Sequence, residues 1–404
     1  MRRFARRLAI PLCCVMLVGP ACHSGKKGTA GGSDTTPTKE DIKVGAIFDL
    51  SGPTADTGTP YSEGIRDYVD YRNARGGVEG HKLALTAQDY GYKVTAAGEI
   101  YSQDVSQGSK VIMGWGSADT EALRPKVNAD MIPFMSTALN ETLTDPAVAP
   151  YNFFASASYS QQLRIALRYI ADQNRGRHVE VAVFYNDSPF GVSPLEDGKR
   201  YIADQKLDVG FKNYPMPATA TDYLAQIGQA SAQKARYIIV QNASRAAARL
   251  AGDLVGQKST VQLVCLNLCA DELFVKLAGP AAEKMIGVMP YAPPSAGGAG
   301  LDEINGFLKA KNTTATDKGL YYVQGWYTMA TMAEGIANAL KANNDKADGP
   351  SIKAGLERIT DFKTGVTDPI SFSSTSHAGL MSAGLYQVEN GSFKKISDPI
   401  RVAK

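Results

Sequence analysis

The segment between residues 42 and 83 constrains the fold of this chain more than any other. Its first seven residues, Ile42–Phe48, are apolar and partly β-branched, as is typical of a strand buried on both faces. Ser51-Gly52-Pro53 ends that run, because proline cannot continue a ladder. Apolar residues then recur at helical spacing over 61–69, and Gly76-Gly77 ends the helix before a second apolar run. This order predicts a parallel α/β sheet.

The strand and helix alternation continues along the chain and then restarts. Further strands are predicted at 111–113, 132–135, 237–240 and 263–266, and helices at 119–130 and 159–172. Residues 179–185 form a strand that is followed by a loop and a helix over 194–205, which repeats the layout of the first segment. A long helix is expected over 321–343, and short alternating runs within 370–402 finish a sheet edge. The repetition predicts two lobes of similar build.

Composition and charge are those of an ordinary globular protein. The chain has 404 residues, of which 44% are hydrophobic and 21% charged, and its formal net charge is +3. Four arginines in the first seven residues account for more than all of that charge, since residues 1–21 hold no acid. The remainder is close to neutral and gives no electrostatic reason to expect nucleic-acid binding.

The N-terminal region has the pattern of an export signal. The arginines precede an apolar run, residues 8–18, that is too short for a comfortable transmembrane helix. Gly19-Pro20-Ala21-Cys22 follows, and it resembles the lipobox of bacterial lipoproteins, in which the cysteine is acylated. We expect a signal peptide over 1–21, a lipid on Cys22 and a flexible tether over 22–40. Simple cleavage without a lipid is the alternative.

Two cysteines remain beyond Cys22, and both fall in one apolar stretch. If 261–269 is a strand, Cys265 and Cys269 lie about 13 Å apart, which is too far for a disulfide. We expect two reduced, partly buried thiols, unless the chain turns at Leu266-Asn267 and brings them together.

Motifs for catalysis, metals and nucleotides are missing from the sequence. The four histidines are scattered, and there is no H-E-x-x-H, phosphate-binding loop or G-x-S-x-G elbow. Gly114-x-Gly116 follows a strand, but Asp119 stands where a dinucleotide fingerprint has its third glycine. We therefore expect no cofactor, no metal and no enzyme activity.

Loops rich in small polar and aromatic residues follow the predicted strands in both halves. Hydroxyls, amides and backbone N–H groups orient polar ligands, and aromatic rings cover their apolar parts. Either these loops are turns only, or together they form a ligand site at the carboxyl ends of the strands. The loops are Ser51–Thr59, Trp115–Ser117, Ala138–Asn140, Ser188–Gly191, Gln241–Ser244 and Asn267.

Several of these motifs resemble the branched-chain-amino-acid-type solute-binding proteins of bacterial ABC importers, a class of periplasmic binding proteins. The resemblance starts with IKVGAIFDLSGPTADTG and the GGVEGHKL that follows the first helix. YNDSPFG, at 185–191, is similar to the loop that opens the family's second lobe, and GWYTMATMAEGI, at 325–336, to its late helix. The resemblance implies two Rossmann-like α/β lobes joined by three hinge crossovers: residues 41–158 and 292–366 in one lobe, 159–291 and 367–404 in the other.

The resemblance also implies a ligand site between the lobes. Ser117 and Asn140 match positions that hold a ligand carboxylate, and Phe190 matches a stacking aromatic residue. Thr57 and Trp115 belong to the first-lobe wall, and Ala138 supplies a backbone contact. The complete expected set is Thr57, Trp115, Ser117, Ala138, Leu139, Asn140, Phe190, Asn242 (or Ala243) and Asn267.

One position departs from the amino-acid binders. Where they carry an acid for the ligand ammonium, this chain has Asn267, and a buried ammonium without a counter-charge is costly. The ligand is therefore a branched-chain or other apolar amino acid, or instead an aromatic or apolar carboxylate or amide. Asp187 or Asp222 could supply the acid that pairs with the ligand ammonium, which would again favour an amino acid as the ligand.

The resemblance implies a lipid-anchored transport protein on the periplasmic side of a bacterial membrane, whose partners are a small ligand and an inner-membrane ABC permease with its ATPase. A ligand sensor of the same fold that signals to a membrane receptor is the alternative. An enzyme that uses Ser117 is a third, weaker hypothesis.

Overall fold

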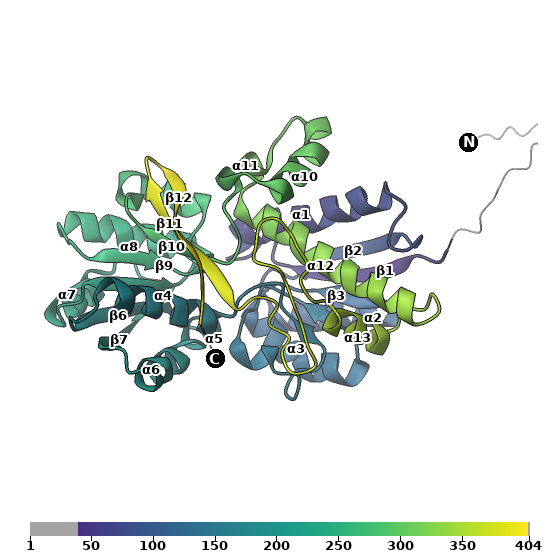
Figure 1. Cartoon of the computed structure of the whole chain (residues 1–404), viewed down its shortest axis with the longest axis horizontal. Coiled ribbons are helices and arrows are strands. Elements are labelled where there is room, and N and C mark those ends of the chain that lie inside the picture. Colours follow the sequence, from purple (N-terminus) through teal and green to yellow (C-terminus); the bar gives the residue numbers. More distant parts are fainter. Residues whose placement is uncertain (1–38, 403–404) are drawn as a thin grey trace, which may run out of the picture. The chain divides into compact units, whose positions relative to one another are not determined.

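The computed structural model describes residues 39–402. A five-stranded parallel sheet forms the centre of the first lobe, with the strand order β2-β1-β3-β4-β5 (Figure 1). Every residue of β1 except Lys43 is buried, as its apolar pattern predicted. The strands are β1 Ile42–Phe48, β2 Leu83–Asp89, β3 Val111–Met113, β4 Phe134–Met135 and β5 Asn152–Phe153.

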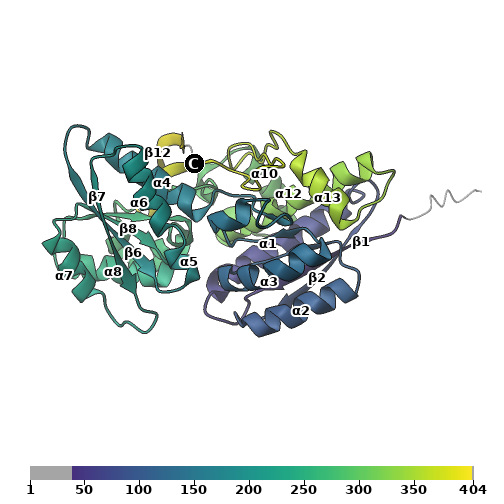
Figure 2. The same ribbon diagram turned by 90° about the horizontal axis from the view of Figure 1, so that it is seen from below.

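Helices from both halves of the sequence complete the first lobe. Helix α12 packs along α1, and α13 packs on α12, whereas α2 and α3 contact each other (Figure 2). Helix α12 is apolar on nearly all sides, which suits its burial. The helices are α1 Ala55–Asn73, α2 Val94–Ser106, α3 Ser117–Asp130, α10 Ala299–Leu308, α11 Ala315–Lys318, α12 Leu320–Ala342 and α13 Gly349–Glu357.

A seven-stranded sheet forms the centre of the second lobe, in the order β12-β11-β10-β9-β8-β6-β7. Strands β6 to β10 are parallel, and β11 and β12 add an antiparallel edge, as the tail predicted. The strands are β6 Val179–Asn186, β7 Val209–Met216, β8 Tyr237–Gln241, β9 Gln262–Cys265, β10 Ile286–Met289, β11 Ser382–Glu389 and β12 Ser392–Arg401. The helices are α4 Tyr159–Gln173, α5 Pro189–Val192, α6 Leu195–Asp204, α7 Leu224–Ala232, α8 Ser244–Gly256 and α9 Glu272–Ala278.

Three connections run between the two sheets and hydrogen-bond to one another. The N–H of Phe154 donates to the carbonyl of His377 at 3.1 Å, and the N–H of Gly379 donates to the carbonyl of Phe154 at 2.8 Å. In the second connection, the N–H of Ala292 donates to the carbonyl of Val366 at 2.7 Å. The lobe boundaries at 158/159, 291/292 and 366/367 stay predictions; in sequence they lie between β5 and α4, between β10 and α10, and between α13 and β11.

The local structure corrects the sequence interpretation at several places. Helix α1 begins at Ala55, so the loop after β1 ends earlier than the predicted Thr59. The chain does turn after β9, because a short 3-10 helix spans Asn267–Cys269, yet Cys265 and Cys269 are both free thiols and buried, as expected. Within residues 370–372 only Ile370 forms an isolated bridge, with Phe362, and no strand forms there.

The predicted signal peptide, Cys22 and residues 22–38 of the tether lie outside the described residues. Lys39 and Glu40, the last two residues of the predicted tether, are described. The Lys39 ammonium donates to Asp345 at 2.7 Å, and the Glu40 carbonyl lies 2.6 Å from His81 Nδ1. None of the helices within 39–402 has the length and apolar character that a membrane span requires.

Candidate functional site

The loop after β1 is held in shape by one buried carboxylate. Asp49 accepts hydrogen bonds from the backbone N–H of Gly52 at 2.6 Å and of Thr54 at 2.8 Å, and from the Thr54 hydroxyl at 2.6 Å. A side chain at position 58 would place its Cβ 2.1 Å from the Asp49 carbonyl oxygen, so only glycine fits there. The Ser-Gly-Pro motif and its following glycine therefore serve to fold this loop tightly against β1.

The same loop orients Trp115, which follows β3. Its indole N–H donates to the Thr54 hydroxyl at 2.8 Å. The centroid of its ring lies 5.2 Å from that of Tyr61 and 6.3 Å from that of Tyr321. Thr57 is buried in the first turn of α1, and its hydroxyl donates to the Thr54 carbonyl at 2.9 Å. Trp115 thus lies between the two lobe-1 helices α1 and α12, and Thr54 is its direct partner.

Tyr159, the first residue of α4, lies next to Ser117. Its hydroxyl donates to the Thr137 carbonyl at 3.0 Å and is hydrogen-bonded to the Ser117 hydroxyl, while its backbone N–H donates to the Leu139 carbonyl at 2.8 Å. Burial raises the pKa of Tyr159 to about 12, so it stays a neutral donor. The place that the resemblance gave to a ligand carboxylate is therefore taken by a tyrosine of the second lobe.

The loop after β4 joins an apolar cluster that contains residues from both lobes. Phe190 meets the Tyr159 ring edge-on, with ring centroids 5.1 Å apart. We call this group the interlobe cluster: Ala138, Leu139, Leu143, Ala149, Phe154, Tyr159, Phe190 and Leu268. Three of the expected site residues, from segments more than 50 positions apart, are thus brought together.

Asn140 and Asn267 each bury an amide oxygen that has no partner within residues 39–402. Asn140 Nδ2 donates to Glu121 at 3.2 Å, but its Oδ1 is buried without a hydrogen bond. Asn267 donates its backbone N–H to Gln162 at 3.0 Å, and its Oδ1 is likewise buried and unpaired among the described residues. Such an acceptor costs about 1–3 kcal/mol when nothing donates to it, which favours a ligand donor here.

Asn242 differs from Asn140 and Asn267 because its side-chain amide already has hydrogen-bond partners within the protein. Its Oδ1 accepts from Asn186 Nδ2 at 3.2 Å and from the backbone N–H of Ala243 at 2.8 Å. Its Nδ2 points to the sulfur of Met216 at 3.5 Å. These contacts tie the ends of β6, β7 and β8 together, so Asn242 supports the second-lobe wall.

The connections between the lobes contribute a floor to the site that was not predicted from the sequence. A small cavity of about 10 Å³ is lined by Ser156 and Tyr291 of two connections, by Gln324 of α12 and by Asn267. The Ser156 hydroxyl is buried and no residue within 39–402 is hydrogen-bonded to it, whereas the Tyr291 hydroxyl donates to the Ala155 carbonyl at 2.6 Å. Polar groups thus converge where both lobes and the crossovers meet.

Two buried acids flank this region, and neither was expected. Asp271 caps α9 by accepting from the N–H of Phe274 at 2.7 Å, and it also accepts from the Ser244 hydroxyl at 2.7 Å. Asp119 accepts from the Tyr90 hydroxyl at 2.8 Å. Burial raises the pKa of each carboxyl to about 7. Asp187 and Asp222, the acids suggested from the sequence, are both exposed.

An ion pair joins the lobes at the rim of the site. Arg245 Nε of α8 lies 2.6 Å from Asp56 Oδ2 of α1, with side chains 64% and 43% exposed. Hydrogen bonding to Asp56 raises the pKa of Arg245 further above its ordinary value. An exposed pair of this kind contributes little to stability, but it links residues 189 positions apart.

The residues that sequence reasoning missed lie outside the loops that were selected from the sequence. Tyr159 and Tyr321 lie in the first turns of α4 and α12, Ser156 and Tyr291 lie in the connections that follow β5 and β10, and Asp271 caps a helix. The Asp271-x-x-Phe274 spacing before an apolar run was an available signal for the cap. No group of histidine, cysteine and acidic residues suited to a metal ion occurs within 39–402.

Comparison with known proteins agrees with this architecture. The family model described as periplasmic binding protein matches residues 41–392. A protein of Brucella suis described as Leu/Ile/Val-binding protein homolog 7 is 26% identical over 192 residues, which is 44% of this chain and 47% of the relative. The chain thus spans about half the length of the curated relatives it matches.

Two solved structures share the fold over nearly the whole length. A branched-chain amino acid ABC transporter protein from Thermus thermophilus with bound valine has a TM-score of 0.83 at 20% identity, covering 91% of this chain and 97% of that one. A fatty acid ABC transporter substrate-binding protein from Thermomonospora curvata has a TM-score of 0.80 at 18% identity, covering 90% and 93%. With two α/β lobes, three crossovers and a family match over residues 41–392, the chain belongs to the periplasmic binding protein family.

Proposed function

We propose that this protein is an extracytoplasmic solute-binding lipoprotein of an ABC importer. It holds a small ligand between its lobes: a branched-chain or other apolar amino acid, or an aromatic or apolar carboxylate or amide. Family membership and the two-lobed fold support the transport role. The relatives named above bind valine or carry names for Leu/Ile/Val and for fatty acids, which spans the same range of ligands.

The buried amide oxygens favour ligands that carry N–H groups, an amino acid or an amide, over a simple carboxylate. Neither Asn140 Oδ1 in the first lobe nor Asn267 Oδ1 in the second lobe has a donor in the part of the chain that the structure describes. A ligand with N–H groups, whether an ammonium or an amide, supplies the missing donors to both lobes, and contacts to both lobes stabilise the closed hinge. The apolar part of the ligand then lies against the interlobe cluster, which includes Phe190.

The ligand's acidic end has two candidate partners. The Ser156 hydroxyl is buried and has no hydrogen-bond partner among the described residues, so it can donate to a ligand. Ser117 becomes available only when Tyr159 gives up its hydrogen bond, because the two hydroxyls are paired. A carboxylate at Ser117 therefore costs this hydroxyl its hydrogen bond to Tyr159, whereas one at Ser156 costs no such bond.

Thermal-shift measurements test this site directly, because a ligand that binds only the folded protein stabilises it by about 2.7 kcal/mol at a concentration of 100 times its Kd. We expect leucine, isoleucine or valine, or else benzoate-like acids and amides, to raise the melting temperature. The Phe190→Ala and Asn267→Ala variants should lose most of that shift. Val192→Ala is the matched control, since Val192 is exposed in the same short helix as Phe190.

The outcomes separate the ligand classes. A shift with branched-chain amino acids alone would remove the carboxylate and amide alternatives, and the reverse result would remove the amino acids. Shifts that survive in both the Phe190 and Asn267 variants would place the ligand elsewhere and contradict the proposed site.

The anchor is tested on the mature N-terminus. We expect mass spectrometry of membrane-extracted protein to show an acylated Cys22 as the first residue, and the Cys22→Ala variant to be released from the membrane fraction. A mature chain that begins elsewhere, or an unmodified Cys22, would contradict the lipid anchor. Permease and ATPase genes beside this gene would favour the transport role over the sensor alternative.

A further inference from the structure

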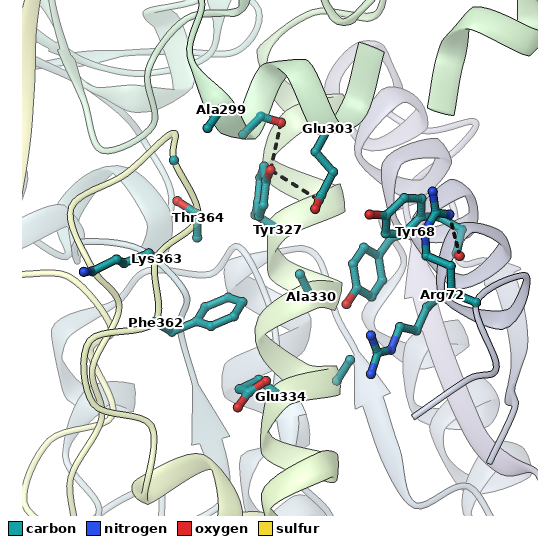
Figure 3. A pocket seen from close by; sticks show the side chains of 15 residues that line it. Tyr68, Arg72, Ala299, Glu303, Tyr327, Ala330, Glu334, Phe362, Lys363 and Thr364 are labelled. Carbon is teal, nitrogen blue, oxygen red and sulfur yellow. Dashed lines mark hydrogen bonds between the residues drawn. The ribbon is translucent and has the colours of Figure 1, made fainter. Parts of the chain in front are cut away.

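A second cavity lies on the first lobe, away from the interlobe site. Its volume is about 580 Å³, and it lies between α1, α10, α12 and the loop 362–365. Figure 3 shows α12 as its floor, with Tyr68 and Arg72 on one wall and Phe362 and Lys363 on the other. None of the interlobe residues described above lines it.

Small residues on the floor and aromatic rings on the walls create this space. Ala330 and Ala333 of α12 leave room above the helix. Gly300 allows the loop to come close, because a Cβ there would lie 2.2 Å from the Thr364 carbonyl oxygen. Tyr68 and Phe362 stand on facing walls. The cavity therefore offers apolar surfaces suited to an aliphatic or aromatic body.

Two charged groups in the cavity are already paired. The Glu303 carboxylate accepts from the indole N–H of Trp326 at 3.1 Å, and the Tyr327 hydroxyl lies within 3.5 Å of the same oxygen. The Arg75 guanidinium lies 3.7 Å from the centroid of the Tyr71 ring. These contacts leave Glu303 and Arg75 as parts of the wall.

Two other charged groups in the cavity, of opposite sign, have no partner among the described residues. The Nε of Arg72 is buried without a hydrogen bond, and Arg72 forms no ion pair within 39–402. Glu334 is half-buried, and its carboxylate likewise has neither an ion pair nor a hydrogen bond with a described residue. Figure 3 shows the two side chains on opposite sides of the α12 floor.

We infer that this cavity is a second ligand site, for a small zwitterion with an apolar or aromatic body. The ligand carboxylate pairs with Arg72, for which a guanidinium fork is the preferred partner. The ligand ammonium pairs with Glu334, and the body lies over Ala330 between Tyr68 and Phe362. A simple cation would meet Arg72 unfavourably and a simple anion would meet Glu334 unfavourably, so only a ligand with both charges satisfies the two groups.

The two tryptophans of the chain make the sites separately observable. Trp115 lies at the interlobe site, whereas Trp326 lies beside the second cavity. The centroid of the Trp326 ring is 5.5 Å from that of Tyr68 and 5.0 Å from that of Tyr71. In a full-length Trp115→Phe, Phe190→Ala protein, tryptophan fluorescence reports only on Trp326, and the interlobe aromatic contact is gone. L-phenylalanine is the probe, and we expect it to change this fluorescence saturably.

Charge variants in the same protein test the assignment. Arg72→Gln and Glu334→Gln should each raise the apparent Kd by at least about tenfold. Arg66→Gln is the matched control, since Arg66 is exposed on the same helix as Arg72 and does not line the cavity, and it should change the Kd less than about twofold. Phenethylamine and hydrocinnamate, which each keep one charge, should bind at least about tenfold more weakly than L-phenylalanine.

Each other outcome overturns the inference. Fluorescence that stays unchanged or fails to saturate would leave the cavity without this ligand. Equal binding of L-phenylalanine and phenethylamine would exclude a zwitterion site, and so would an unchanged Kd in either charge variant. Failure of the interlobe site would instead appear in the Trp326→Phe protein, whose fluorescence comes from Trp115, so the two proposals fail independently.

Discussion

Replacing Gly325 with leucine is expected to lower the free energy of unfolding by at least about 3 kcal/mol. Helices α1 and α12 cross with their backbones almost in contact, and a Cβ at position 325 would lie 2.0 Å from the Tyr61 carbonyl oxygen. Gly64 on the facing helix is equally close to the Tyr322 carbonyl, at 2.1 Å. The helices must separate to admit any side chain, which opens the core beneath the interlobe site. Urea unfolding followed by circular dichroism measures the loss.

The matched control is Gly98→Ala in α2. No atom lies within 4 Å of a Cβ at that position, so alanine meets nothing and improves the helix. It should raise the free energy of unfolding by about 0.5–1 kcal/mol. A Gly325→Leu protein that is within about 0.5 kcal/mol of the parent would show that the helix crossing tolerates a side chain, and the close-packing argument would be wrong.

The second large effect concerns Asp271 and pH. Burial raises the pKa of this carboxyl from 3.8 to about 7, so the folded protein holds the proton more tightly than the unfolded chain. The contribution of Asp271 to stability is therefore fully present below pH 4 and is lost as the pH rises to about 7. Asp271→Asn keeps an acceptor for Ser244 and Phe274 but has no charge to bury. Its stability relative to the parent should rise by up to about 4 kcal/mol between pH 4 and pH 8.

Urea unfolding at a series of pH values measures this difference. Asp119→Asn should behave similarly, because burial also raises the pKa of Asp119 to about 7. Asp317→Asn is the control of opposite sign: hydrogen bonds from Thr314 lower the pKa of this exposed carboxyl, so its contribution is lost as the pH falls. A stability difference for Asp271→Asn that does not change with pH would contradict the buried-acid interpretation.

Much of the fold could be predicted from local sequence, because burial on both faces leaves a direct pattern. The apolar run Ile42–Phe48 became β1, and the run at 179–185 became β6. Asn390-Gly391, a residue pair typical of hairpin turns, forms the tight turn between β11 and β12, where both residues have a positive φ. These elements depend on residues that are neighbours in the chain, so their patterns can be recognised in the single sequence.

The expected site was only partly visible from the sequence. The structure brings Ala138, Leu139 and Phe190 into one cluster and leaves unpaired amide oxygens on Asn140 and Asn267. Their roles in ligand binding stay predictions. Tyr159 could not be found by the same reasoning, because its position beside Ser117 depends on where the first crossover delivers α4, and no local pattern encodes that path.

The sequence by itself determined the element order, the parallel sheets and the family, because each depends on periodicity and on motifs within short stretches of chain. Only the tertiary structure decided which side chains share a surface. It placed the charged groups of Arg72 and Glu334 around one cavity, although these residues are far apart in sequence. It also placed Asn267 beside residues of the connections between the lobes, in the wall of a small cavity. Contacts of this kind depend on the packing of whole helices and sheets, where small residues such as Gly325 and Ala330 determine how closely the elements approach.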